Sequence, residues 1–483
     1  MSYSANFVIG VLFGYKVYFD IATRGSLLKI FLLTFVLSLI GILFRKRVST
    51  LFKKFLILGC LFSFACLLGS GYASYRDKDY GDLKVFKGEV VVVESSRDGL
   101  KNKIIATSKE KNTKVSFTLY SPEVFIPGDV LNIDASVQKD NVINPKRISG
   151  SVQSFDYGEY LRSRGVDFNL KVNSFQKGVT HEITLNRLAY KFRGLLFENL
   201  SSTMKDKQAG VVMAMVLGDD SWLDKNIKDT FKMSGLSHVL VFSGFNFVVL
   251  ISFFSLFIQS LNKKTRFSIV VMISILILLI APTSAPTARA AIFVFYSSVA
   301  AWFNKNYNVK YILWVFVGLF CIYDPFAAIY NASFHLSVLA TFGLIYGGEV
   351  ANLITKNKLY QYLFSIISVS LFTTPYLIHV FGAVSLVNIP VNFVSLPIAS
   401  LITVFGLVTL VMSFIFPLLG TALGFLLTFI VDFLIKIAET FSIFYISSSL
   451  IFDSWVSLVC AYLLFCVLYC LLTFGLYIQK TKA

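Results

Sequence analysis

Residues 391–416, VNFVSLPIASLITVFGLVTLVMSFIF, run without a single charged side chain. A helix of about 20 apolar residues is long enough to cross the hydrocarbon core of a bilayer. The whole composition agrees with this stretch, because 56% of the 483 residues are hydrophobic and only 15% are charged, whereas soluble domains carry about 25% charged residues. The sequence therefore excludes a soluble globular protein and predicts a polytopic α-helical membrane protein.

Similar apolar stretches occur in both the N-terminal and the C-terminal part of the chain. They lie near 7–22, 27–44, 51–72, 236–261, 267–281, 288–303, 311–323, 334–350, 360–380, 391–416, 418–437 and 454–478. We expect about 11 or 12 crossings, several of them short, tilted or broken. Asn388, Asn392, Pro390 and Pro397 suggest that one of these helices is broken and that its freed backbone groups face protein or water.

Basic residues in the short loops predict the orientation of the spans. The segment RKRVSTLFKK at 45–54 holds five positive charges and no negative one. Because lysine and arginine favour the cytoplasmic side, we expect this segment inside and residues 73–180 outside. The later loops expected inside carry Lys263, Lys264, Arg266, Lys305, Lys310, Lys356, Lys358, Lys480 and Lys482. Both termini are then cytoplasmic, and most of the formal net charge of +17 is a signal of membrane topology.

Residues 73–180 differ from the rest, because they are charged and contain no run long enough to cross a membrane. Residues 114–120 and 131–137 alternate between apolar and polar side chains, the period of a half-buried strand. Further strand-like segments cover 85–94 and 103–108. A small closed β-barrel of about five strands is the expected fold of this domain.

Residues 181–235 are expected to link the barrel to the main helical bundle through amphipathic helices. Leu185, Leu188, Phe192 and Leu195 share one helical stripe, and Arg187, Lys191 and Arg193 lie off it. This pattern is typical of a helix that lies in the membrane interface. A helix that packs its apolar stripe on the barrel or on the bundle explains the pattern equally well.

The segment 211–250 combines apolar sequence, typical of membrane helices, with polar residues. Ser221 and Asp224 predict a capping box at the start of an amphipathic helix that ends at Gly235. Polar or small residues then follow inside an apolar run: Ser237, His238, Ser243, Gly244 and Asn246. Polar groups are costly in lipid, so this cluster is expected to face a protein interior or a water-filled path. For a single serine, bonding to a helix carbonyl is the simpler explanation.

Several catalytic and cofactor motifs do not occur in the sequence. There is no GxxxxGK[ST], HxHxDH or HExxH, and the six cysteines lie in apolar runs without a CxxC pair. We therefore expect no cofactor, no metal and no enzymatic activity. Energy and hydrolytic chemistry, if the function needs them, are expected from partners.

The segments LGDDSWLD at 217–224 and SGLSHVLVFSGFNF at 234–247 resemble the hallmark of the ComEC family of competence proteins. Further stretches resemble landmarks of that family in the same order. They are FDYGEYLRSRGVDFNL at 155–170, APTARAAI at 285–292, DPFAAIYNASFHLSVLATFGL at 324–344, PYLIHVFGAVS at 375–385 and PVNFVSLPI at 390–398. The resemblance implies a membrane channel that passes single-stranded DNA into the cytoplasm during natural transformation, with an external OB-type domain and a channel domain over 236–483.

The same resemblance suggests which residues meet the DNA. Ser237, His238, Ser243, Gly244, Asn246, Arg289 and Asn392 become candidates for the channel lining. Arg289 has no acidic neighbour in sequence, so it either reaches the lipid headgroups or faces the pore and meets phosphate. Asp219, Ser221 and Asp324 are expected to be structural, with Asp219 paired to a basic residue or capping a helix. His335 is expected to be structural as well.

The external domain contains a basic segment at 97–114. Its positive residues are Arg97, Lys101, Lys103, Lys109, Lys111 and Lys114, against Asp98 and Glu110. An OB-type barrel is able to present such an edge to single-stranded DNA, although a solubilising hairpin explains the charge equally well. Phe117 is expected to point inward, and Tyr120 is the best candidate for an outward aromatic residue.

Two departures from the family pattern affect these expectations. Asn246 stands where the family usually has a histidine, and asparagine forms hydrogen bonds but does not titrate. Many family members also continue into a metallo-β-lactamase-like domain, which is expected to be missing here because the sequence stops at Ala483. The implied partners are therefore a DNA receptor outside the cell, a separate nuclease and a cytoplasmic ATP-driven helicase or translocase, besides membrane lipid.

Two other functions remain open from the sequence. The first is a transporter or flippase of a lipid-linked or small anionic substrate, which shares the polar residues within the membrane but does not explain the barrel. The second is an intramembrane hydrolase that uses Ser237, Ser243 and His238. Ser243 follows His238 by five residues, about 500° of rotation on a regular helix, so such a helix would separate the two side chains.

Overall fold

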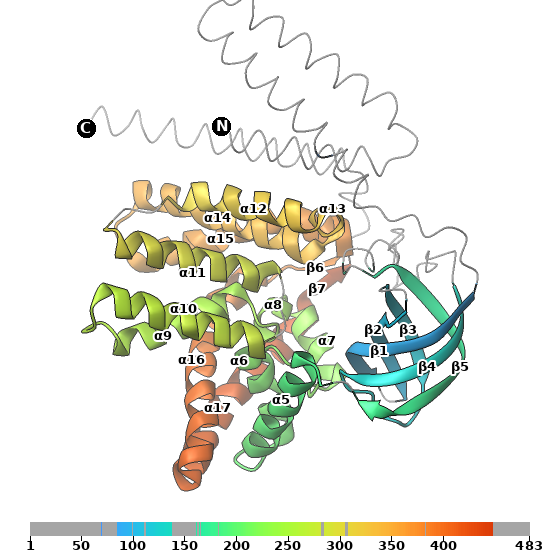
Figure 1. The fold of residues 1–483 in the computed structure, drawn as a ribbon. Helices are drawn as coiled ribbons and strands as arrows, with labels where there is room; N and C mark the ends of the chain where they lie inside the picture. Colours follow the sequence, from blue (N-terminus) through green and yellow to red (C-terminus); the bar gives the residue numbers. More distant parts are fainter. Residues whose placement is uncertain are drawn as a thin grey trace, which may run out of the picture.

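The computed structural model describes residues 85–447, apart from 99, 111–112, 138–160, 162–163, 165, 182, 282–284, 305–307 and 382, and it also describes Gly69. These residues form a β-barrel and a helical part that lie beside each other (Figure 1). The candidate spans at 7–22, 27–44, 51–72 and 454–478 lie outside the described residues apart from Gly69, so the number of crossings stays a prediction.

The barrel consists of five strands that close on themselves in the order β1-β2-β3-β5-β4. Their bounds are β1 Val85–Asp98, β2 Lys101–Ser108, β3 Lys114–Tyr120, β4 Asp129–Val137 and β5 Phe168–His181. The strands β3 and β5 pair in parallel, and all other neighbours pair antiparallel. The expectation of a small closed barrel is confirmed.

The alternation in sequence correctly predicts the inside of the barrel. Val115, Phe117, Leu131 and Ile133 all lie in its core. Tyr120, in contrast, is 74% exposed, as expected for the outward position. The strand β5 was not predicted as a strand, because its apolar residues are interrupted by several polar ones and the alternation is short.

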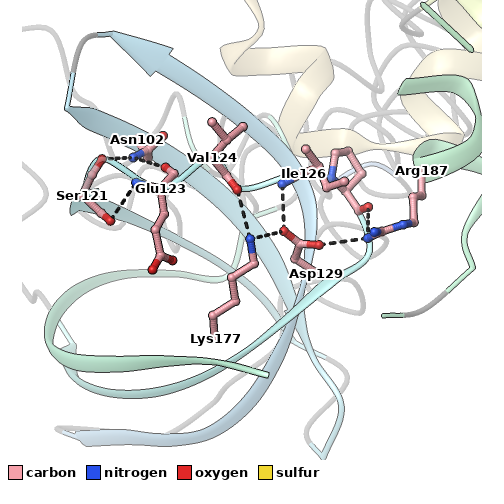
Figure 2. A network of polar contacts seen from close by, with 9 residues as sticks. Asn102, Ser121, Glu123, Val124, Ile126, Asp129, Lys177 and Arg187 are labelled. Atoms are coloured by element: carbon pink, nitrogen blue, oxygen red, sulfur yellow. Dashed lines mark hydrogen bonds and ion pairs between the residues drawn. The ribbon is translucent and has the colours of Figure 1, made fainter. Parts of the chain in front are cut away.

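The helix α5 (Leu185–Ser201) joins the barrel to the helical part. Arg187 on this helix is buried and donates from Nη1 to the Asp129 carboxylate at 2.9 Å and to the Pro127 carbonyl at 3.3 Å. Lys177 reaches the other carboxylate oxygen at 3.0 Å, so Asp129 lies between two cations (Figure 2). The barrel is therefore held on α5 by a buried ionic contact.

The helical part continues from α5 to the end of the described residues. Its elements are α6 Asp206–Leu217, α7 Lys225–Met233, α8 Ser237–Leu240, α9 Gly244–Phe257, α10 Lys263–Ile280, α11 Ala285–Trp302, α12 Val309–Tyr323, α13 Pro325–Tyr330, α14 Ala332–Ile354, α15 Lys358–Phe381, β6 Ala383–Ser385, α16 Asn388–Ile415, α17 Pro417–Phe441, η2 Ser442–Phe444 and β7 Tyr445–Ser447. Figure 1 shows α9, α10, α11, α12, α14 and α15 running together, with α16 and α17 at a steep angle to them.

Four of the described helices are long and apolar enough to cross a membrane. They are the helices at Ala332–Ile354, Lys358–Phe381, Asn388–Ile415 and Pro417–Phe444. Shorter apolar helices cover Gly244–Phe257 and Val309–Tyr323. The predicted apolar stretches from 236 to 437 thus correspond to helices, except that 236–261 is divided into α8 and α9 by an extended Val241.

Two predictions about helix boundaries are wrong. The helix α16 is continuous through Pro397, and Pro390 lies in its first turn, where the missing amide has no carbonyl to meet. The Phe393 carbonyl, which Pro397 leaves without its usual partner, accepts a hydrogen bond from the Tyr362 hydroxyl at 3.2 Å. The amphipathic helix α7 begins at Lys225 with Asp224 as its N-cap, because the Ser221 hydroxyl bonds to Asp219 instead.

The basic loops gather at one end of the helical part. Lys263 at the start of α10 donates to the Asn304 side chain after α11, and Lys310 at the start of α12 pairs with Glu349 near the end of α14 at 2.6 Å. The other end of α10 lies beside α5, where Arg193 donates to the Ile280 carbonyl at 3.0 Å. This arrangement is the one that alternating crossings require.

Candidate functional site

Two groups of polar residues lie among the apolar helices. The first, here called the asparagine group, consists of Gly235, His238, Ser385, Asn388 and Asn392. The second, here called the arginine group, consists of Gly244, Arg289, Ser337 and Thr341. Together they contain four of the seven residues predicted to line a channel.

The asparagine group is built around the start of α16. Asn392 is buried and donates from Nδ2 to the Asn388 carbonyl at 2.8 Å and to its side-chain oxygen at 2.6 Å. Gly235, after α7, has a φ of +85°. A side-chain carbon there would come within 3.0 Å of the Asn388 oxygen, so Gly235 permits both the turn and the close approach.

His238 of α8 borders this group. Its ring approaches the Gly235 backbone and the Asn392 side chain. The side chain of His238 is exposed.

Three buried oxygens on this side of α16 have no hydrogen-bond partner among the described residues. They are Asn392 Oδ1, Ser385 Oγ and Ser395 Oγ. A buried polar atom without a partner costs about 1–3 kcal/mol. Buried polar groups of this kind are normally satisfied by protein or by ordered water, so this side of α16 is suited to polar surroundings and not to lipid.

The first turn of α9 uses two of the predicted residues as structural links. The Ser243 hydroxyl caps the helix and accepts from the Asn246 amide at 3.3 Å. Asn246 is buried and donates from Nδ2 to the Met215 carbonyl at 3.0 Å. Met215 lies in the last turn of α6, whose carbonyls have no partner inside the helix. Asn246 therefore ties the start of α9 to the end of α6.

Arg289 forms the centre of the arginine group. Its Nη1 donates to the Ser337 carbonyl and to the Thr341 hydroxyl, both on α14. Its Nη2 lies 3.1 Å from the position that a side-chain carbon on Gly244 would occupy. The guanidinium thus lies where α9, α11 and α14 meet, and the part of the chain that the structure describes offers it no acidic partner.

The remaining candidates in the membrane part have identifiable positions. Ser237 is exposed at the start of α8. Asp219 pairs with Arg193 at 3.1 Å and accepts the Ser221 amide at 3.1 Å, which agrees with the expected pairing to a basic residue. Asp324 ends α12, and its carbonyl accepts the Ala328 amide of α13 at 3.0 Å.

His335 bonds within the bundle as expected for a structural residue. Its Nδ1 lies 2.5 Å from the Tyr376 hydroxyl of α15, and its Nε2 lies 2.8 Å from the Ala328 carbonyl of α13. His335 thus connects three helices. The described contacts of His238 and Ser243 are also with other partners, and the regular helix assumed between them is interrupted between α8 and α9.

On the barrel, two of the predicted lysines have ammonium groups without an acidic partner among the described residues. Lys101 and Lys103 lie on the same face of β2 and pair with no acidic side chain among the described residues. Lys109 lies 3.5 Å from Glu89, and Lys114 donates to the Arg164 carbonyl at 3.1 Å. The side chain of Arg97 and the whole of Lys111 lie outside the described residues.

Tyr120 stands directly across the strand pair from Lys101, and Thr118 stands across from Lys103. Asn102 and Leu119, between them in sequence, point inward and are buried. The outer wall of β2 and β3 therefore presents two lysines beside an exposed tyrosine. We refer to Lys101, Lys103, Thr118 and Tyr120 as the β2–β3 face.

Several residues of these groups were missed from the sequence. Asn388 was noted only as a sign of a broken helix, although it precedes Asn392 by one helical turn. Ser337 and Thr341 have the same spacing on α14, but serine and threonine are common in membrane helices and carried no distinct signal. Only the packing of α14 against α11 identifies them as partners of Arg289.

A model of the family described as "Competence protein" matches residues 215–475. This match covers more than half of the chain and includes both polar groups. The chain belongs to the competence protein family. It is also similar to ComE operon protein 3 of Bacillus subtilis (strain 168), with 22% identity over 384 residues, which are 75% of this chain and 46% of that protein. The chain thus spans about half the length of this competence relative.

No solved structure matches the chain. Family membership and the apolar helices together make it a membrane protein of the competence family. Within the described residues, no three His, Cys, Asp or Glu side chains cluster as a metal site would require.

Proposed function

We propose that this protein is a membrane channel that passes single-stranded DNA into the cytoplasm during natural transformation. The match of residues 215–475 to the competence family carries this proposal, because it covers the helices that hold both polar groups. A DNA path needs polar or basic groups inside an apolar bundle, since phosphates must be attracted without being held tightly. The asparagine group, with its unsatisfied oxygens, and Arg289, which has no acidic partner among the described residues, supply such groups.

The β2–β3 face is the proposed entry contact. Lysines attract the phosphate backbone, and an exposed aromatic ring stacks on bases of any sequence. Lys101, Lys103 and Tyr120 combine both features on the wall of a small barrel. OB-type barrels use the corresponding strands for oligonucleotides, which supports this assignment over a merely solubilising hairpin.

The membrane in question is the cytoplasmic membrane of a bacterium, with the barrel outside and the basic loops inside. The gathering of Lys263 and Lys310 at one end of the helices supports a single side for these loops, and lysine favours the cytoplasm. Energy and strand degradation come from partners, namely an external DNA receptor, a nuclease and an ATP-driven translocase.

Uptake of labelled DNA by a strain that lacks this gene tests the proposal. We expect the deletion to abolish entry of labelled DNA into the cytoplasm and the wild-type gene to restore it. DNA bound outside the cells, measured by its sensitivity to added nuclease, should remain. Normal import by the deletion strain would refute the channel and favour a transporter or flippase of a small or lipid-linked anion.

A further inference from the structure

We infer that Arg289 and the first turn of α9 form a binding site for one phosphate group. The inference deepens the proposed channel function, because it names the atoms that would meet a phosphodiester inside the membrane part. It rests on the placement of the guanidinium, on the absence of an acidic partner for it among the described residues, and on the glycine that faces it.

The guanidinium is oriented by one of its edges only. Nη1 donates to the Ser337 carbonyl and the Thr341 hydroxyl, and Thr341 itself donates to the Ser337 carbonyl at 2.8 Å. Nε and Nη2 have no hydrogen-bond partner among the described residues. The free edge of an arginine is the edge that binds two oxygens of a phosphate at once.

The free edge faces the positive end of a helix. Nη2 lies beside Gly244, the first residue of α9, and the amides of Gly244 and Phe245 have no acceptor inside that helix. A helix N-terminus carries about half a positive charge. Two positive groups therefore converge without an acidic side chain from the described part of the chain, an arrangement that an anion stabilises.

Gly244 keeps this position open. A side-chain carbon there would lie 2.9 Å from the Pro286 carbonyl, 3.1 Å from Arg289 Nη2 and 3.2 Å from the Ala290 side chain. Any other residue would push α9 away from α11 and cover the guanidinium. The close approach thus brings the helix terminus and the arginine to the same ligand.

A purely structural arginine would hold α11 to α14 and bind no anion, so the test must separate the two roles. The purified full-length chain in nanodiscs is titrated with a fluorescent oligonucleotide that lacks bases and with one whose phosphates are replaced by neutral methylphosphonates. The variants are Arg289→Gln and Arg289→Lys, and Arg266→Gln is the matched control at the basic end of α10. Thermal unfolding is followed in inorganic phosphate and in chloride at equal ionic strength.

The phosphate site predicts that the wild type binds the baseless phosphodiester at least tenfold more tightly than the methylphosphonate. This preference should fall about tenfold in Arg289→Gln and remain in Arg266→Gln. Phosphate should raise the unfolding temperature of the wild type but not that of Arg289→Lys. Lysine keeps the charge but lacks the paired N–H donors that bind two phosphate oxygens at once. Arg289→Lys also provides the decisive measurement if Arg289→Gln fails to fold.

Equal phosphate effects in the wild type and in Arg289→Lys would overturn the site and leave Arg289 as a link between helices. Failure of the channel proposal is distinguishable from failure of the phosphate site. If the protein is not the channel, the deletion strain imports DNA normally, whatever the purified chain binds. Binding that depends on bases but not on Arg289 would support the barrel contact and contradict this inference.

Discussion

At the scale of single residues, the polar side chains of this protein divide into links and free groups. Asn246, His335 and Asp219 each satisfy a defined partner on another element. Lys101, Lys103 and one edge of Arg289 have no such partner among the described residues. The first kind should affect stability when changed, and the second kind should affect ligand contact.

Asn246 is expected to be important for stability. Asn246→Ala removes the donor to the Met215 carbonyl and leaves a buried acceptor without a partner, which costs about 1–3 kcal/mol. The unfolding temperature in nanodiscs should fall. It should fall less in Asn246→His, because the histidine ring still offers a hydrogen-bond donor. Asn226→Ala, at an exposed position of α7, is the control. Equal stability of Asn246→Ala and the control would contradict this role.

The β2–β3 face is expected to act in DNA capture. Replacing Lys101 and Lys103 by glutamine should reduce affinity for short single-stranded oligonucleotides and flatten its salt dependence, because fewer phosphate counterions are released. Tyr120→Ala should cost about 1–3 kcal/mol of binding to DNA and nothing to a baseless backbone. The matched control replaces Lys87, which pairs with Asp134, and Lys171 on β5. A control that weakens binding as much would show that only overall charge matters.

At the scale of elements, α5 has an unusual orientation. Its apolar stripe is exposed, with Leu185 at 73%, Leu188 at 53% and Leu195 at 58%. Arg187 and Arg193, on the other side, make ionic contacts with the barrel and with Asp219. These ionic contacts hold the helix to the protein together with Leu196 and Leu200, which are buried in the core of the helical part. The predicted stripe itself faces outward, which favours the interfacial alternative for that stripe.

This orientation predicts contact between α5 and lipid. In a chain without its native cysteines, an environment-sensitive dye at Phe192→Cys should report an apolar surrounding in nanodiscs, and brominated lipid should quench it. The same dye at Lys191→Cys, one residue away and off the stripe, should remain in water. Similar quenching at both positions would refute an ordered interfacial helix.

The joint between α5 and the barrel should weaken in acid. Burial by itself raises the pKa of Asp129, but hydrogen bonds from Arg187, the Ile126 amide and Lys177 outweigh it and lower the pKa below its ordinary 3.8. A lowered pKa stabilises the folded state at pH values above the ordinary pKa, and this contribution is lost as the pH falls through the folded value.

Hydrogen exchange of the β4 amides therefore tests the joint. Protection in the full chain should be constant from pH 7 to about 5, after correction for the intrinsic rate, and should fall below about pH 4. In Asp129→Asn, the β4 amides should be less protected at pH 7, and their protection should fall less in acid. A steep acid loss that persists in Asp129→Asn would assign it to other carboxylates.

At the scale of the whole molecule, the contacts between loops predict the topology. Residues near 304 lie beside Lys263, and Lys310 pairs with Glu349, so these loops share one side of the membrane. Reporter tags at residue 50 and near 304 should be cytoplasmic, and a tag at residue 100 should be external. A tag at 304 on the same side as one at 100 would contradict the alternating crossings and the proposed entry through the barrel.

The sequence by itself determined the class of this protein, the barrel and the extent of most helices. Membrane helices and half-buried strands are visible in sequence because each residue's preference for lipid, core or water depends on its own side chain and its immediate neighbours. The topology signal is local in the same sense, because it depends only on the basic residues within each loop. The prediction of a broken helix at α16 was wrong. Tyr362, 31 residues from Phe393, donates the hydrogen bond that the Phe393 carbonyl loses because of Pro397.

The tertiary structure alone decided which polar residues act together. Asn246 meets a carbonyl 31 residues away, and Arg289 meets α14 at separations of 48 and 52 residues. It also turned the apolar stripe of α5 outward and placed Tyr120 opposite Lys101. Such pairings depend on how helices and strands pack across the fold, and no spacing along one element encodes them.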